Sequence, residues 1–233
     1  MEIISTRIML TSELLPLLRL FQLVSPSLPV GTYSYSQGLE WVVESQMVVD
    51  EATAQQWINE ILQHSLASLD GPILVRIYQA WQTNDDGNLH YWNDWLLSSR
   101  ETLELRAEDQ HLGMALGKVL DGLELNWSDR WNEQATTFVT PFGLAAVSWK
   151  IPVNMAISAY LWSWLENQVL AAIKLVPLGQ LAGQRIMYKL GENIPGYVES
   201  SLHIQDQQIS GSLPMLGIAS SRHETQYSRL FRS

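Results

Sequence analysis

The sequence predicts an all-α protein that forms a single domain, and three observations support that prediction. Apolar side chains recur at intervals of three and four residues along most of the 233-residue chain, which is typical of helices that bury one face. No window alternates apolar and polar side chains over the length of a strand. A chain of this size also buries enough surface for one stable core without cross-links.

Composition limits the kinds of function that the chain can have. Its formal net charge is −10, and an acidic chain lacks the clustered basic residues that bind phosphates, so no nucleic acid is expected as a partner. Since it contains no cysteine, disulfides, thiolate metal sites and a cysteine nucleophile are excluded. The longest apolar stretch, residues 156–165, is shorter than the about 20 residues that span a bilayer. We therefore expect a cytoplasmic protein that does not contact a membrane.

Caps and prolines place the expected helices in the first third of the chain. Ser12 is suited to cap a first helix. Residues 25–36 then contain two prolines and a glycine, which break that helix. Asp50 is a good N-cap for the helix that follows and reaches residue 69. Gly71-Pro72 begins a separate helix, because proline fits the first helical turn.

Similar patterns place the remaining helices. Residues 84–88 are polar and end the helix before them. Ser98 and Glu101 have the spacing of a capping box at the start of a long helix. Pro152 and Pro177 separate the last long helices from their neighbours. The expected helices, roughly ten in all with those above, include 36–44, 71–81, 91–97, 98–120, 138–149, 153–176, 177–190 and 193–201.

No linker, internal repeat or low-complexity tract divides the chain. Residues 1–233 are therefore expected to form one helical domain. The C-terminal segment, residues 205–233, is expected to be partly flexible and to bind a partner.

No motif of an enzyme or of a metal site is present. Gly31 to Ser34 lacks the spacing of a nucleophile elbow, and Gly113 to Val119 departs from a phosphate-binding loop in spacing and in its last residue. The histidines lie singly in separate segments and form no ligand set: His64, His90, His111, His203 and His223. No catalytic residue, metal ligand or cofactor is therefore expected.

Charged residues gather at the start of the helix expected over 98–120. Arg100 and Glu104 have the spacing of an i, i+4 ion pair, and Arg106 and Asp109 that of an i, i+3 pair. The simplest interpretation is a solvated helix face. The excess of acidic residues leaves a docking surface as the alternative.

Tryptophan is unusually frequent, with ten in the chain. Trp162 and Trp164 are two positions apart, so on a helix they point in nearly opposite directions. One is expected to face the core and the other a neighbouring chain or a packed loop. The alternative is a central helix buried on both sides. We favour self-association or a partner site on this helix, because exposed aromatic residues anchor interfaces.

The tail, residues 222–233, combines arginines with aromatic and aliphatic residues. Such segments are often disordered in the free chain, and they can order when they bind a partner. Both states are compatible with one function.

Five separated motifs resemble those of the urease accessory protein F family. They are LPVGTYSYSQGLE (28–40), SRETLELRAE (99–108), FGLAA (142–146), VPLGQ (176–180) and RHETQYSRLF (222–231). The motifs occur in order along nearly the whole chain, and together they are far more specific than any one of them.

The resemblance implies an all-α homodimer that is not an enzyme. Such proteins link the urease accessory protein D, called H in some species, to the accessory GTPase G. That complex docks on apo-urease and inserts nickel in a GTP-dependent way. The resemblance assigns a GTPase-recruiting helix to Tyr160, Trp162 and Glu166. It assigns binding of the D/H protein to a segment that becomes ordered on that partner: Arg222, His223, Glu224, Tyr227, Ser228, Arg229, Leu230 and Phe231.

A second hypothesis is a helical enzyme or small-molecule-binding protein with an apolar pocket. Its support is the content of tryptophan and methionine, ten and seven residues respectively. It predicts a ligand bound to the purified protein and activity without partners.

Overall fold

The computed structural model describes residues 14–132 and 135–233. The predicted all-α class is confirmed, because the backbone of those residues forms helices and no strand. Residues 14–23 are helical; the expected cap at Ser12 lies outside the described residues. The further elements are η1 (Thr32–Ser34), α2 (Leu39–Glu44), α3 (Glu51–Ile61), η2 (Leu62–Asp70), α4 (Gly71–Thr83), α5 (Asp86–Ser98), α6 (Leu103–Gly122), α7 (Trp127–Arg130), α8 (Val139–Ser148), α9 (Val153–Leu175), α10 (Gln180–Gly191), α11 (Ile194–His203), η3 (Asp206–Gln208) and α12 (Pro214–His223).

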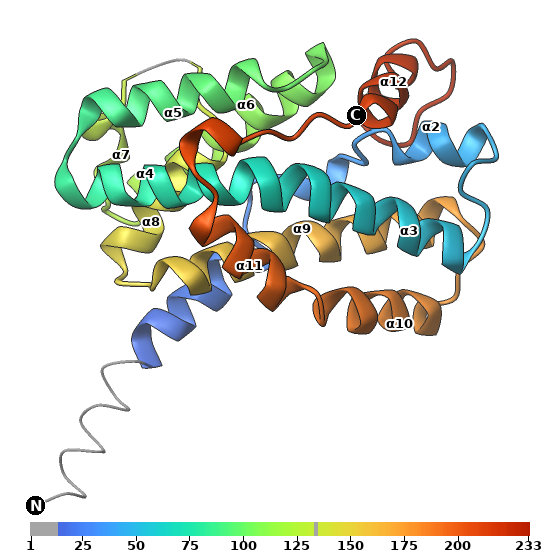
Figure 1. The fold of residues 1–233 in the computed structure, drawn as a ribbon, viewed down its shortest axis with the longest axis horizontal. Coiled ribbons are helices and arrows are strands. Elements are labelled where there is room, and N and C mark those ends of the chain that lie inside the picture. Colours follow the sequence, from blue (N-terminus) through green and yellow to red (C-terminus); the bar gives the residue numbers. More distant parts are fainter. Residues whose placement is uncertain (1–13, 133–134) are drawn as a thin grey trace, which may run out of the picture.

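A long rod made of α3, η2 and α4 runs the length of the molecule (Figure 1). Asp50 caps it as predicted, with its carboxylate accepting the Thr53 N–H at 2.9 Å. The segment η2 has π-helical hydrogen bonds and joins the two α-helices without a break. Helix α4 starts at Gly71 with Pro72 in its first turn, as predicted, but it continues directly from η2 with no turn or loop between them.

The rod tolerates Pro72 because other segments supply the missing hydrogen-bond donors. Proline has no N–H, so carbonyl groups one turn before it lose their helical donor. The Ala67 carbonyl instead accepts the Ser201 hydroxyl at 2.8 Å, and the Ser68 carbonyl accepts the Ser210 N–H at 3.3 Å. These donors come from more than a hundred residues away, so no local pattern reveals them.

The later helices agree closely with the sequence patterns. Helices α8, α9, α10 and α11 were all predicted, with bounds that differ by a few residues. Helix α5 was predicted only over 91–97, but it begins at Asp86 because the Asp85 carboxylate accepts the Asn88 N–H at 3.0 Å. Helix α12 was not predicted.

The predicted capping box at Ser98 and Glu101 is wrong. Ser98 ends α5, and its hydroxyl donates to the Trp95 carbonyl. Thr102 is the N-cap of α6 instead, and its hydroxyl accepts the Leu105 N–H at 3.2 Å. Because Ser98 is still the last residue of α5, the cap of α6 falls four residues later, at Thr102.

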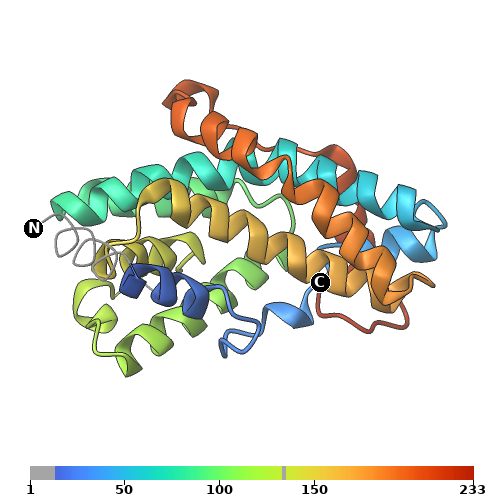
Figure 2. The ribbon, with the colours of Figure 1, turned by 90° about the horizontal axis from the view of Figure 1, so that it is seen from below.

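Helix α9 lies at the centre of the fold, alongside the rod in both views (Figures 1 and 2). It also contacts α10 and α11, so it needs apolar residues on several faces. Trp162 and Trp164 are both half-buried. Trp162 packs against Gly191 at the end of α10, whereas the Trp164 indole N–H donates to Gln37 at 2.9 Å in the loop before α2.

Two glycines of α6 give a matched test of how closely this helix packs against residues 136 and 137. A methyl group at Gly113 would collide with the backbone oxygens of Thr136 and Thr137, whereas one at Gly122 meets nothing. Gly113→Ala is expected to lower the free energy of unfolding by about 1–3 kcal/mol. Gly122→Ala is expected to leave it unchanged or raise it by up to about 1 kcal/mol. Urea unfolding of both variants checks this, and equal midpoints would contradict the close packing at Gly113.

Candidate functional site

Three of the five sequence motifs meet at one place in the structure. The motif over 28–40 supplies the loop before α2 and the start of α2, the motif over 99–108 supplies the start of α6, and the tail packs against both. Hydrogen bonds join each pair of these segments. This meeting point, which we call the tail site, is the candidate functional site.

Glu40 of α2 holds the backbone of the tail. Its two carboxylate oxygens accept the Leu230 N–H at 2.6 Å and the Phe231 N–H at 2.9 Å. The Phe231 ring is buried, and the Lys174 ammonium lies 5.6 Å from its centre. The Leu230 side chain is 66% exposed. One carboxylate therefore fixes which of two adjacent side chains points into the protein.

A fully buried histidine lies between two helices of the tail site. His223, at the end of α12, has one ring nitrogen 3.3 Å from the Glu40 carboxylate and the other 2.8 Å from the Glu104 carboxylate. The second oxygen of Glu104 accepts a bond from Arg229 at 2.6 Å. The predicted ion pair between Arg100 and Glu104 is thus wrong, because the tail covers this face of α6.

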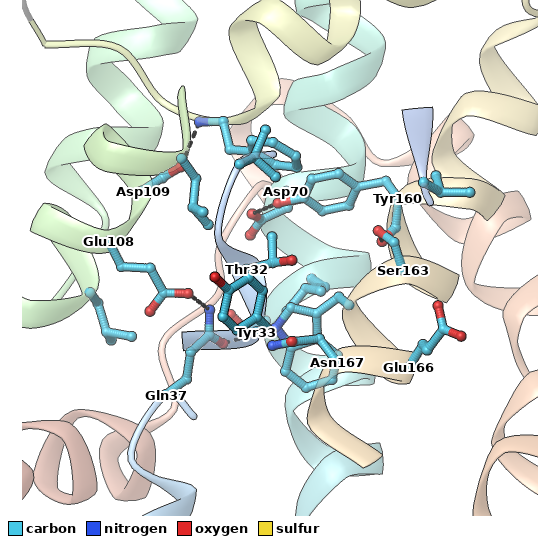
Figure 3. Close-up of a pocket in the computed structure, with 18 of the residues that line it drawn as sticks. Thr32, Tyr33, Gln37, Asp70, Glu108, Asp109, Tyr160, Ser163, Glu166 and Asn167 are labelled. Atoms are coloured by element: carbon cyan, nitrogen blue, oxygen red, sulfur yellow. Dashed lines mark hydrogen bonds between the residues drawn. The ribbon is translucent and has the colours of Figure 1, made fainter. Parts of the chain in front are cut away.

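Ser233, which follows Arg232 in the tail, is also buried. The Ser233 carbonyl accepts the Ser36 N–H at 2.7 Å, the Ser36 hydroxyl at 2.6 Å and the Gln37 N–H at 3.1 Å. The Ser233 hydroxyl donates to Glu108 at 2.7 Å, and the Gln37 amide donates to the other Glu108 oxygen at 2.9 Å (Figure 3). These bonds tie α6, the loop before α2 and the tail together.

A buried charge network lies next to the tail site. Arg100 bonds Asp70 of η2 at 2.6 Å and Asp109 of α6 at 2.8 Å. The Tyr160 hydroxyl of α9 donates to Asp70 at 2.7 Å (Figure 3), and Asp109 also accepts the Phe138 N–H at 2.7 Å. The predicted pair of Arg106 and Asp109 is therefore wrong, because Asp109 points into the protein.

Burial controls the protonation of this network. Burial raises the pKa of Asp109, and Arg100 offsets part of that rise. Burial and the neighbouring Asp70 raise the pKa of Tyr160 well above its usual range, so the phenol keeps its proton as a hydrogen-bond donor. Despite its own burial, the pKa of Arg100 is raised by the two aspartates. The network thus links η2, α6 and α9 through buried ion pairs and hydrogen bonds.

A cavity of about 130 Å³ adjoins the network (Figure 3). Its wall includes Tyr33, Gln37, Glu108, Glu166 and Asn167. Ligand pockets for drug-sized molecules measure roughly 300–1,000 Å³, so this cavity is too small for such a ligand, although a cavity of about 150 Å³ can hold a benzene-sized molecule.

The assigned site residues fall into distinct environments. Tyr160 is buried, whereas Trp162 and Glu166 are half-buried on α9; partial burial raises the pKa of Glu166. In the tail, His223 and Phe231 are buried. Glu224 is half-buried and accepts the Glu104 N–H at 3.3 Å. The exposed members of the tail are Arg222, Tyr227, Ser228, Arg229 and Leu230.

Sequence reasoning missed the carboxylates that organise the tail site. Glu40 lies within a motif quoted for the family resemblance, but residue type and spacing gave no reason to select it. Glu108 belongs to the acidic group at the start of the helix expected over 98–120, which was interpreted as a solvated face or a docking surface and not as a contact of the tail. Asp70 lies between two predicted helices and carried no pattern at all. What selects these residues is contact with segments that are remote in the sequence.

Glu108 makes the stability of the fold depend on pH. Burial raises the pKa of its carboxyl from 4.5 to about 7, although the bonds from Ser233 and Gln37 favour the charged form. Between these values the folded chain holds a proton that the unfolded chain has released. The free energy of unfolding therefore falls as the pH rises from about 4.5 to 7 and levels off above it, by roughly 3 kcal/mol in total.

Glu108→Gln is expected to remove this contribution. The free energy of unfolding of the variant minus that of the wild-type chain should rise by roughly 3 kcal/mol as the pH increases from 4.5 to 8. Urea unfolding of both chains at several pH values measures the difference, in which the titration of groups that do not interact with Glu108 cancels. A difference that stays constant with pH would show that Glu108 ionises normally.

Two other kinds of site are absent from residues 14–132 and 135–233. No three histidine, aspartate or glutamate side chains gather in a way that could hold a metal ion in that part of the chain. No helix within the same ranges is both long and apolar enough to cross a bilayer.

Comparisons with known proteins agree with the sequence motifs. The UreF family model matches residues 48–191. The urease accessory protein UreF of an Azoarcus species is 49% identical over 226 residues, which cover 94% of this chain and 97% of that protein. The proteins of the same name from Alkalilimnicola ehrlichii and Hahella chejuensis are 47% and 41% identical over similar spans.

The fold and the tail site define a class of all-α protein whose buried carboxylates bind its own backbone and side chains. The extent of the match makes the assignment specific: this chain belongs to the UreF family of urease accessory proteins. It is an accessory protein of urease maturation and not an enzyme, and it works with other urease accessory proteins.

Proposed function

We propose that this chain is the adaptor that links the D/H accessory protein to the accessory GTPase G. The resulting complex docks on apo-urease and inserts nickel in a GTP-dependent way. The observation that carries the proposal is the tail, which is anchored to the folded body and yet presents exposed apolar and basic side chains.

The exposed side of the tail suits a protein partner. Tyr227 is fully exposed and Leu230 largely so, and Arg222 and Arg232 are exposed near them in the sequence. Aromatic residues and arginine are the types that most often dominate binding energy at interfaces. We assign this side of the tail to the D/H protein.

The GTPase is assigned to α9 and its surroundings. Tyr160 is buried and bonded to Asp70, so its role is to hold α9 in place. Trp162 and Glu166 keep part of their surface accessible. We therefore propose that these two side chains, and not the Tyr160 ring, contact the GTPase.

Self-association is assigned to the helical residues 14–23. Leu14, Leu18 and Phe21 follow one another at helical spacing, and each is more than half exposed. The opposite face buries Leu20 and Leu23. A helix that is apolar on both faces needs a second partner, and we propose a second copy of this chain as that partner.

A bridging experiment tests the adaptor function. The purified GTPase and D/H protein are mixed with and without this chain and separated by size-exclusion chromatography. The GTPase is expected to elute with the D/H protein only when this chain is present. Trp162→Ala is expected to release the GTPase while the D/H protein stays bound. Co-elution of the two partners without this chain would contradict the proposal.

A further inference from the structure

One face of α9 carries three hydrogen-bond donors, each of which binds another segment of the protein. The Tyr160 hydroxyl donates to Asp70 of η2 at 2.7 Å (Figure 3). The Trp164 indole N–H donates to Gln37 at 2.9 Å, and the Asn167 amide donates to a carbonyl group of the same loop at 3.2 Å. Positions 160, 164 and 167 follow one another at helical spacing, so the donors share one face. We call these three residues the polar stripe.

The polar stripe borders the cavity of about 130 Å³. All three of its residues belong to the cavity wall, together with Ser163 of the same helix. A side chain that borders a cavity lacks partner atoms at van der Waals distance on that side, so packing holds it less firmly. Directed hydrogen bonds therefore contribute more to the rotation of α9 about its axis than they would in a filled core.

The acceptor of the Trp164 N–H is itself held in place. The Gln37 amide nitrogen donates to Glu108 at 2.9 Å (Figure 3), which leaves the Gln37 oxygen to accept the indole N–H. Trp164 thus faces a packed loop, one of the two positions that the sequence allows for a tryptophan of this pair. Its indole is used within the protein, and Trp162 is left as the partner-facing member.

The polar stripe lies on the other side of α9 from Trp162. An α-helix turns by about 100° per residue, so Trp162 points about 200° away from both Tyr160 and Trp164. Trp162 packs against Gly191 at the end of α10 and keeps part of its surface exposed. Glu166 follows Trp162 by one turn. A rotation of α9 would therefore displace both residues that are assigned to the GTPase.

We propose that the residues of the polar stripe are positioning residues for GTPase binding: they fix the rotation of α9 so that Trp162 and Glu166 face the GTPase. The inference rests on the proposed function of α9. A surface that is held in its binding orientation loses less conformational entropy in the complex, so its affinity is higher. The polar stripe acts through Trp162 and Glu166 and does not itself touch the GTPase.

The first test compares two tryptophans that donate similar bonds. Trp164→Phe removes the indole N–H of the polar stripe. Trp81→Phe is the matched control, because Trp81 is buried on α4 and donates its N–H to the Thr140 carbonyl at 2.9 Å. In the full-length chain bound to the D/H protein, affinity for the GTPase should fall about tenfold for Trp164→Phe. It should stay at the wild-type value for Trp81→Phe, although that variant loses stability.

A pair of tyrosines repeats the comparison with a smaller change. Tyr160→Phe removes one hydroxyl and keeps the ring. Its control is Tyr197→Phe, since the Tyr197 hydroxyl of α11 donates to Asn59 of α3 at 2.9 Å. Tyr160→Phe should weaken GTPase binding about tenfold and leave binding of the D/H protein unchanged. Tyr197→Phe should change neither affinity.

Fluorine NMR of the chain labelled with 5-fluorotryptophan reports the orientation of α9 without the GTPase. The signal of Trp162, identified by its absence in Trp162→Phe, should shift in Tyr160→Phe and stay in place in Tyr197→Phe. An unshifted signal would overturn the positioning role. So would wild-type GTPase affinity in both polar-stripe variants, or an equal loss of affinity in their controls. The proposed function fails separately, if the GTPase and the D/H protein co-elute without this chain.

Discussion

Removing residues 222–233 is expected to abolish co-purification with the D/H protein, with a loss of affinity on the order of a hundredfold or more. The deletion removes Tyr227 and Leu230, the exposed apolar side chains of the tail. It also removes Arg222 and Arg232, which are exposed in the same segment. Affinity measured by titration calorimetry, with the full-length chain as reference, gives the size of the loss.

A second variant separates binding from folding, because the deletion also removes His223 and Phe231 from the protein interior. Tyr227→Ala combined with Leu230→Ala leaves those buried residues and the Glu40 bonds in place. This double variant should keep the helical circular dichroism and thermal midpoint of the wild-type chain and still bind the D/H protein far more weakly. Wild-type affinity in both variants would contradict the assignment of the tail.

Arg100→Ala is expected to destabilise the fold strongly, lowering the free energy of unfolding by about 3–5 kcal/mol. It leaves Asp70 and Asp109 buried without their cationic partner. An ordinary domain has only about 5–15 kcal/mol of stability. Much of the variant should therefore unfold at modest urea concentrations, as followed by circular dichroism.

Lys118→Ala provides the comparison for a change of charge alone. Lys118 is an exposed residue of α6, and its loss should alter stability by no more than about 0.5 kcal/mol. Adding Asp70→Asn to Arg100→Ala removes one of the two unpaired charges and should recover part of the loss. If Arg100→Ala is as stable as Lys118→Ala, the buried network does not brace the fold.

Local sequence patterns predicted the helices that depend on local causes. Asp50 caps α3 with the spacing that the sequence shows, and α9 ends next to Pro177 as expected. The apolar periodicity of α8 through α11 likewise lies within each segment. In these cases the residues that determine the structure are neighbours in the chain.

The failures come from contacts between remote segments. The i, i+4 rule assumes a solvated helix face, but Glu104 pairs with Arg229 of the tail and Asp109 points inward to Arg100 and to the Phe138 N–H. The continuous helix through Pro72 depends on donors from Ser201 and Ser210. Single-sequence patterns contain no information about such pairs.

The candidate site shows the same limit more strongly. The family resemblance marked the tail, yet it gave no reason to separate inward His223 from outward Tyr227. Glu40 lies 190 and 191 residues from the two amides that it binds, and Glu108 lies 125 residues from Ser233. Only the folded arrangement reveals which acids hold the tail.

Activation of apo-urease tests the adaptor function most directly. Apo-urease, nickel, GTP, the D/H protein and the GTPase are combined with and without this chain, and urease activity is measured over time. Activity is expected to appear only when the chain is present, and to be lost with the chain that lacks residues 222–233. Equal activation when the chain is omitted would contradict the proposed role.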